Sequence, residues 1–259
     1  MTIPTISQNI LGDKHFEQAR LRAAASHHSS DWLNCLPIPA NGLKLDDPSM
    51  RACVGLRLGT TLCVPHKCTN CGDLVSKYGR HGLSCEKSKG RHSRHKQAND
   101  LIRRAMESAG YPAYLEPEGL DKDTQKRPDG RSLIPWTEGK PGAWDFTCCD
   151  TLASSYVMKS SKNACQAAEI AENRKITKYE GLNQFVFYPV AVETLGSWGE
   201  VSKKFITDIG SRIAAITGEK RSTSFLFQRL SVAVQRGNAA AIQGTLPKSK
   251  KLDEIYNLF

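Results

Sequence analysis

The sequence predicts an α/β protein in which helices flank a mixed sheet, and three observations indicate this class. The chain has 259 residues, 39 % of them apolar, which is enough to bury a sizeable core. Between residues 98 and 193, helical and strand-like patterns follow one another in the order helix, three strands, helix, strand. The predicted strands are separated by turn sequences rich in Pro and Gly, such as PWTEGKPG at 135–142.

The composition indicates the kind of partner and compartment. The 36 Lys and Arg residues exceed the 26 Asp and Glu residues, so we expect an anionic partner, and nucleic acid rather than a membrane. The first thirty residues lack a basic segment followed by an apolar run, and no stretch approaches the ~18 apolar residues of a membrane span. We therefore expect an intracellular protein without a membrane partner. In that setting, nine cysteines, several beside histidines, favour metal binding or free thiols over disulfides.

Residues 1–60 are expected to form a helical lead-in. The Ala-rich stretch 16–30 favours one helix, because alanine has the highest helix propensity. A second helix is predicted to start with Asp47 as its N-cap and Pro48 in its first turn.

Residues 61–90 contain a candidate zinc-binding segment. CTNCGDLVSKYGRHGLSC has the spacing Cys-x2-Cys-x9-His-x3-Cys and predicts four ligands: Cys68, Cys71, His81 and Cys85. Four protein ligands leave no open position, so we expect structural Zn²⁺ that helps to fold a segment poor in apolar residues. Two upstream residues are alternative ligands: Cys63 and His66. The other interpretation is a loop of reduced cysteines with an incidental histidine.

Residues 91–195 are expected to form the core of the protein. A basic run, KSKGRHSRHK, opens into the helical pattern ANDLIRRAMESAG, which ends at Gly110. Strands are predicted at AYLEP, RSLIPW and GAWDFTCC, followed by a helix over 163–181 and a long strand at QFVFYPVAVE. Residues 196–259 are expected to form two amphipathic helices, over 200–217 and 222–241, followed by the Lys-rich tail PKSKK.

Two aspartates occupy strand-like positions on either side of the Pro- and Gly-rich turn. Pro128 biases Arg127 toward an extended conformation, so Asp129 is expected where the chain joins a strand. In GAWDFTCC, side chains alternate between two faces, and Asp145 lies on the face opposite Trp144 and Phe146.

A carboxylate in such a strand is costly unless it is paired or bound to a cation. The hairpin would bring Asp129 and Asp145 close enough to share Mg²⁺. The alternative is that RPDG is an ordinary turn and that Asp145 caps a neighbouring loop.

A lysine interrupts the apolar stripe of the predicted helix over 163–181. Steps of three and four residues join Ala164, Ala168, Ala171, Lys175, Tyr179 and Leu182. Lys175 is expected either to extend to the rim of the helix or to point its ammonium group at the carboxylates. Lys178, near the edge of the stripe, is the second candidate.

The order of these motifs resembles the core of PD-(D/E)xK restriction-endonuclease-like proteins. More narrowly, the zinc segment followed by RHSRH, RPD, WD and KxxKY resembles the restriction-like endonuclease of site-specific non-LTR retrotransposons. The phrases HGLSC, KRPDG, LIPW, WDFT, DTLASSY and ETLG are also similar to a group of uncharacterised, mobile-element-associated proteins. The resemblance covers about residues 20 to 245. It departs from the family at Thr147, where the strand usually carries the lysine, and Lys175 fits a lysine moved to the following helix.

The resemblance implies a DNA endonuclease that hydrolyses phosphodiester bonds with Mg²⁺ or Mn²⁺. Asp129 and Asp145 would hold the catalytic ion, and Lys175 or Lys178 would stabilise developing negative charge. Asp100, at the start of the first core helix with His95 and Asn99, is a further candidate metal ligand; the alternative is that Asp100 pairs with arginines on its own helix. The expected contacts to nucleic-acid phosphates are Arg91, Arg94, Lys96, Arg103, Arg104 and Arg127.

The resemblance also implies partners and a location. The sequence contains no Tyr-x-Asp-Asp box of a reverse transcriptase, so we expect that enzyme to be supplied by another part of the element, and element RNA to be a second partner of a nuclear protein. Two other functions remain open. One is a catalytically inactive, zinc-stabilised nucleic-acid-binding protein, which Thr147 favours, and the other is an adaptor within the ribonucleoprotein of a mobile element.

Overall fold

The computed structural model of the protein describes residues 6–118 and 127–247, with side chains described from residue 14 on. Its centre is a four-stranded sheet in the order β3 (Ala113–Leu115), β4 (Gly130–Thr137), β5 (Lys140–Cys149) and β6 (Val186–Glu193). The first two pairs are antiparallel, whereas β5 and β6 are parallel. The predicted α/β class with a mixed sheet is therefore confirmed.

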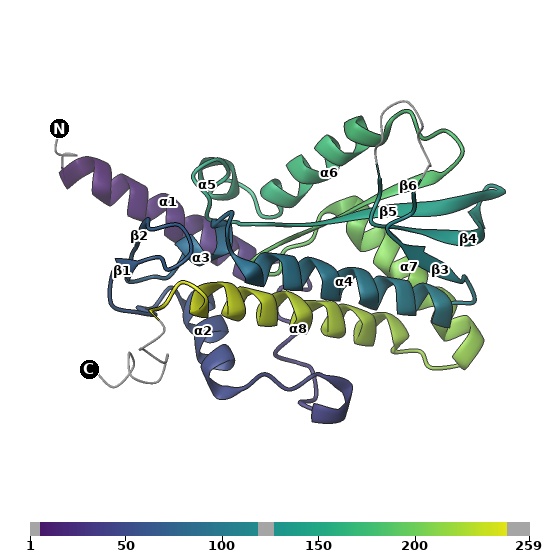
Figure 1. Cartoon of the computed structure of the whole chain (residues 1–259), viewed down its shortest axis with the longest axis horizontal. Helices are drawn as coiled ribbons and strands as arrows, with labels where there is room; N and C mark the ends of the chain where they lie inside the picture. The colour runs from purple at the N-terminus through teal and green to yellow at the C-terminus, as the bar shows by residue number, and fades with distance from the viewer. Residues whose placement is uncertain (1–5, 119–126, 248–259) are drawn as a thin grey trace.

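Helices cover both faces of the sheet (Figure 1). On one face, α4 (Lys89–Ser108), α7 (Glu200–Thr217) and α8 (Ser222–Gln243) enclose the main apolar core with side chains of β5 and β6. On the other face, α6 (Gln166–Tyr179) packs its alanines against β5 and β6. The sheet therefore presents one face to α4 and the other to α6.

The remaining elements surround this core. The N-terminal lead-in forms α1 (Ile6–Ala25), a 3₁₀ turn η1 (Pro39–Asn41) and α2 (Asp47–Leu58). The zinc segment forms a short antiparallel hairpin and one helical turn: β1 (His66–Lys67), β2 (Leu74–Val75) and α3 (His81–Ser84). A further turn of helix, α5 (Val157–Ser160), precedes α6.

Two details of the lead-in differ from the prediction. The first helix ends at Ala25 rather than continuing to residue 30, because the Ser26 and Ser29 hydroxyls bond to the carbonyl oxygens of Ala23 and Ala24. The N-cap of α2 is Asp46 and not Asp47, since the Asp46 side chain accepts a hydrogen bond from Ser49 N at 2.8 Å. In both places a side chain satisfies a backbone group at the helix end.

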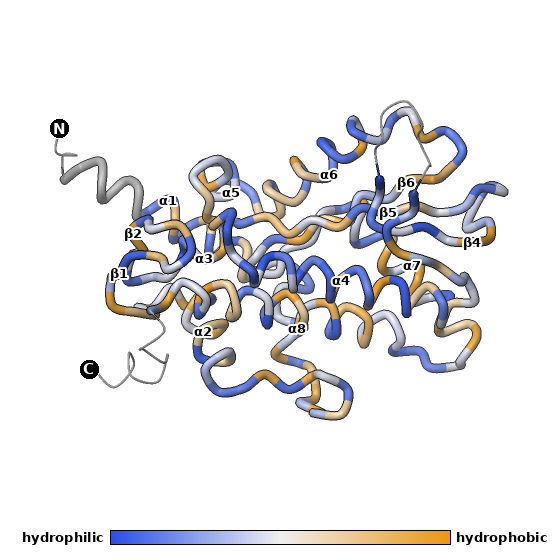
Figure 2. The backbone as a smooth tube through the Cα atoms, in the orientation of Figure 1, coloured by the Kyte–Doolittle hydropathy of each residue, from blue (hydrophilic) through white to orange (hydrophobic). Residues whose placement is uncertain are grey.

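The helix α4 begins at Lys89, earlier than the apolar pattern predicted, and therefore includes most of the basic run. Figure 2 shows the hydrophilic character of its N-terminal half. The C-terminal helices occupy the predicted positions, and the Lys-rich stretch after Pro247 lies outside the described residues. Among the described residues, no helix combines the length and apolar character needed to cross a membrane.

Candidate functional site

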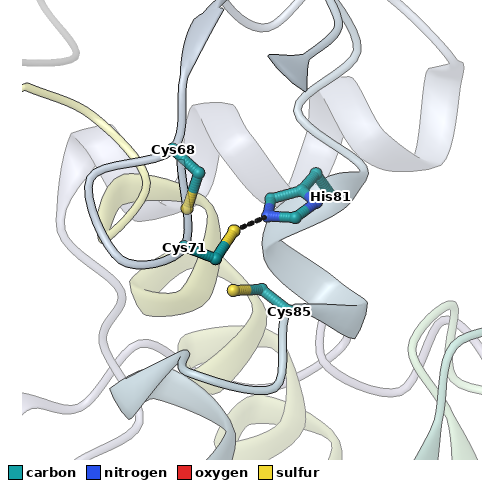
Figure 3. A group of neighbouring side chains, drawn as sticks. All are labelled: Cys68, Cys71, His81 and Cys85. Carbon is teal, nitrogen blue, oxygen red and sulfur yellow. Dashed lines mark hydrogen bonds between the residues drawn. The ribbon is translucent and has the colours of Figure 1, made fainter. Parts of the chain in front are cut away.

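The four residues of the predicted zinc segment lie together. The ligand atoms of Cys68, Cys71, His81 and Cys85 are all within 4.8 Å of one another, and Cys71 Sγ is 3.1 Å from His81 Nε2 (Figure 3). Three thiols and one imidazole suit tetrahedral Zn²⁺, with bonds of about 2.3 Å to sulfur and about 2.0 Å to nitrogen. The cluster could thus hold one zinc ion through four protein ligands.

The two alternative ligands are engaged elsewhere. Cys63 Sγ donates to the carbonyl oxygen of Ser76 at 3.4 Å, and burial raises the pKa of this thiol. The His66 ring lies 2.9 Å from Val64 O and 3.1 Å from Thr245 Oγ1. Neither residue belongs to the Cys/His cluster.

The zinc segment packs against the end of α8 rather than standing apart from the core. Thr69 and Asn70 side chains donate to Gly244 O at 3.0 and 2.8 Å. At Gly90, a Cβ atom would lie 2.5 Å from Ala241 N, so only glycine permits this approach of α4 to α8. The segment therefore joins the start of α4 to the end of α8.

Asp145 lies on the α6 face of β5, as the alternation of side chains predicted. It is only 3 % exposed. Lys175 Nζ, from α6, approaches Asp145 Oδ1 to 2.5 Å, and the Tyr179 hydroxyl lies 2.6 Å from Oδ2. Lys178 Nζ is 3.7 Å from the same Oδ2. One carboxylate thus meets two ammonium groups and one phenol, all supplied by the last turns of α6.

Asp129 lies just before β4 and contacts the two residues that flank Asp145 in β5. Gly130 pairs with Trp144 in the antiparallel register, and Asp129 N also donates to Trp144 O, at 2.9 Å, so the regular ladder does not continue to Asp129. The Asp129 carboxylate also accepts a hydrogen bond from Phe146 N at 2.7 Å, next to Asp145.

His95 completes this group from the α4 side. Its Nε2 is 2.9 Å from Asp129 Oδ2, and the hydrogen bond to Asp129 raises the pKa of His95. Burial raises the pKa of Asp129, but the bonds from His95 and Phe146 outweigh burial and hold this pKa below its usual value. Asn99 supports the arrangement, because its Oδ1 accepts a bond from Trp144 Nε1 at 3.0 Å.

An open cavity of about 330 Å³ adjoins His95. Its lining includes Arg91, His92, Arg94, His95, Thr147 and Cys148. The cavity therefore places basic groups of α4 beside the part of β5 that follows Asp145.

No protein-family model matches the sequence, and no curated protein matches it either. The function proposed below depends on the contacts of the described residues.

Asp100 does not join the other carboxylates. It forms ion pairs with Arg103, at 3.0 Å, and with Arg104, whose Nε lies 2.8 Å from Asp100 Oδ2. Consecutive residues of a helix differ by about 100° in direction, so Asp100 faces away from the side on which Asn99 meets Trp144. These ion pairs agree with the alternative drawn from the sequence, in which Asp100 pairs with arginines on its own helix.

The expected phosphate contacts divide into exposed and engaged residues. The expectation that Arg94 contacts phosphate is corrected, because Arg94 is only 2 % exposed. It donates to Asn238 Oδ1 at 2.5 Å and so joins α4 to α8. Arg91 donates to Ser84 O and Cys85 O at 3.2 and 3.3 Å. Lys96 is exposed, and Arg127 lies 3.2 Å from Glu116.

Two buried carboxyl groups hold α6 in place. Glu193, with no exposed surface, accepts bonds from Ala167 N and Ala168 N at 3.0 and 3.3 Å, and burial raises its pKa to about 7. Glu172 accepts Ser202 N at 2.8 Å, and burial raises its pKa as well. The helix that carries Lys175 is therefore anchored both to β6 and to α7.

Proposed function

We propose that the protein is a metal-dependent DNA endonuclease of a non-LTR retrotransposon, or derived from one. The observation that carries this proposal is the buried carboxylate of Asp145, which lies 2.5 Å from the Lys175 ammonium group, while the Asp129 carboxylate bonds to the backbone N of the next residue, Phe146. Buried acids grouped with a cation and a titratable histidine are typical of catalytic sites.

The donor set fits a hard divalent cation. Carboxylate oxygens are the ligands that Mg²⁺ prefers, and Mn²⁺ accepts the same donors. Asp129 and Asp145 would hold the ion, while Asp100 pairs with Arg103 and Arg104. When bound, such an ion polarises a phosphoryl oxygen and lowers the pKa of a water molecule.

The residues of this chain would supply orientation and charge. Lys175 would stabilise negative charge that develops on the phosphoryl group, since its ion pair with Asp145 keeps the ammonium in place. The protonated form of His95, favoured by Asp129, would add a second positive group on the α4 side. Lys178 would extend the positive charge at the end of α6.

The order of elements supports a PD-(D/E)xK type of core. The succession α4, β3, β4, β5, α6, β6 agrees with the resemblance drawn from the sequence, with Asp129 before β4 and Asp145 in β5. Thr147 stands where the strand lysine of that family is expected, and Lys175 approaches Asp145 from the helix instead.

Nucleic acid would enter along the basic half of α4. Lys96, Arg91 and His92 belong to this half, and Arg91 and His92 also line the cavity beside His95 and Thr147. Structural Zn²⁺ would hold the start of α4 against α8. Element RNA, a reverse transcriptase from another part of the element and a nuclear location belong to the same proposal.

The test is nicking of supercoiled plasmid DNA in Mg²⁺, with EDTA as the negative condition. Wild type should nick, Asp145→Asn should not, and Asp208→Asn, at a partly exposed position of α7, should nick like wild type. DNA binding without cleavage by wild type would favour the inactive binding protein that Thr147 suggests. Neither binding nor cleavage would favour the ribonucleoprotein adaptor.

A further inference from the structure

The Tyr179 hydroxyl bridges the two chain segments that carry the aspartates. It lies 2.6 Å from Asp145 Oδ2, on β5, and 2.7 Å from the carbonyl oxygen of Arg127. Arg127 is two residues before Asp129, in the segment that enters β4. A single side chain therefore touches one carboxylate and the backbone that presents the other.

The hydroxyl can serve the carboxylate as a permanent donor. A phenol has one proton, which it gives to one acceptor at a time, and an ionised carboxylate is a stronger acceptor than a carbonyl. A phenol has an ordinary pKa of about 10, so it keeps its proton near neutral pH. Lys178 Nζ donates to the same oxygen at 2.8 Å, which also fixes the direction of the hydroxyl.

The ring of Tyr179 is fixed by its packing. The residue is 2 % exposed and belongs to an apolar cluster with Ala143, Leu182 and Phe185. The Phe187 ring lies 4.5 Å from the Tyr179 ring, centroid to centroid. Because the ring has little freedom, the position of its oxygen is set by the fold rather than by the ligand.

We infer that Tyr179 is a positioning residue for the divalent-metal site. Its hydroxyl orients the Asp145 carboxylate beside the segment that leads into Asp129, so that both carboxylates can serve one ion. This role rests on the proposed function and extends it. Partners of metal ligands commonly contribute ten- to a hundredfold to metal affinity or activity.

Tyr156 offers a matched control. Its hydroxyl accepts a hydrogen bond from Arg174 of α6 at 2.8 Å, and it packs against the apolar cluster of α6 that contains Cys149. It therefore also contacts α6 through a phenol, but its contact is with Arg174 rather than with Asp145.

The experiment measures the Mg²⁺ concentration for half-maximal nicking by zinc-loaded wild type, Tyr179→Phe and Tyr156→Phe. Binding of Mn²⁺ to the same proteins, followed by electron paramagnetic resonance, gives a readout that does not require cleavage. Tyr179→Phe should raise both the half-saturating Mg²⁺ concentration and the Mn²⁺ dissociation constant by about tenfold or more. Its rate at saturating Mg²⁺ should stay within about threefold of wild type. Tyr156→Phe should leave all three quantities unchanged.

The outcomes separate this inference from the proposed function. Wild type that binds Mn²⁺ but does not nick DNA would overturn the endonuclease, while the Mn²⁺ constants would still decide the role of Tyr179. Wild type that nicks, together with Tyr179→Phe that has an unchanged half-saturating concentration, would overturn the role of Tyr179 and leave the endonuclease standing. If Tyr179→Phe does not fold, Phe187→Leu keeps the hydroxyl but loosens its ring, and it should shift the metal constants in the same direction.

Discussion

Replacement of Glu193 by Gln should change how the stability of the protein depends on pH. Burial raises the pKa of Glu193 from 4.5 to about 7, which means that folding favours the protonated carboxyl. The stabilisation that Glu193 provides is therefore fully present below about pH 4.5 and is lost as the pH rises through about 7. Each pKa unit corresponds to about 1.4 kcal/mol, so this interval amounts to about 3 kcal/mol.

Gln keeps an oxygen that can accept the bonds from Ala167 N and Ala168 N but does not ionise. Urea titrations would measure the free energy of unfolding of both proteins at pH 4.5 and at pH 8. The stability of Glu193→Gln minus that of wild type should be about 3 kcal/mol larger at pH 8 than at pH 4.5. Asp150, whose pKa burial also raises, titrates in both proteins and largely cancels in the comparison. Glu180→Gln, at an exposed position, should show no such dependence. A Glu193→Gln difference that is equal at both pH values would refute the buried-carboxyl reasoning.

Two further predictions concern the metal and the basic helix. Elemental analysis should find one Zn²⁺ per chain. Cys71→Ser should lose the zinc and have a lower thermal midpoint, whereas Cys35→Ser should keep the zinc and the midpoint of wild type. Wild type that contains no metal when purified without chelator would contradict the site. Affinity for DNA should fall steeply with salt, and Lys96→Gln should weaken binding to all sequences alike and reduce the salt slope by about one. Arg94→Met should instead leave DNA affinity unchanged and lower the free energy of unfolding by about 2 kcal/mol, because Asn238 loses a charged donor. Reduced DNA affinity without loss of stability would contradict the structural role of Arg94.

The parts of the site that the sequence could predict depend on local periodicity. Alternation along β5 fixed the face on which Asp145 lies, opposite the core residues Trp144 and Phe146. The three- and four-residue spacing along α6 brought Lys175 to the sheet, where its ammonium group meets Asp145. The zinc ligands were predictable because their spacing allows two tight pairs, Cys68 with Cys71 and His81 with Cys85, to face one another.

The parts that could not be predicted depend on contacts between distant segments. Arg94 reads as one more charge in a basic run, yet it is buried because α8 brings Asn238 to it across 144 residues. Glu193 reads as a strand-end charge until α6 begins directly over it. Tyr179 fits an apolar stripe, and no local signal in the sequence indicates that its hydroxyl faces a carboxylate 34 residues away.

The central claim, that Asp145 and Lys175 act as one catalytic unit, is tested most directly by a double-mutant cycle on the single-turnover nicking rate. The four proteins are wild type, Asp145→Asn, Lys175→Met and the double variant, each at saturating Mg²⁺, with Lys159→Met as an exposed control. If the two residues act together, each single variant should lose about a hundredfold or more, and the double variant should lose little beyond either single one. Lys175→Met that nicks as fast as wild type, or losses that multiply in the double variant, would contradict the claim.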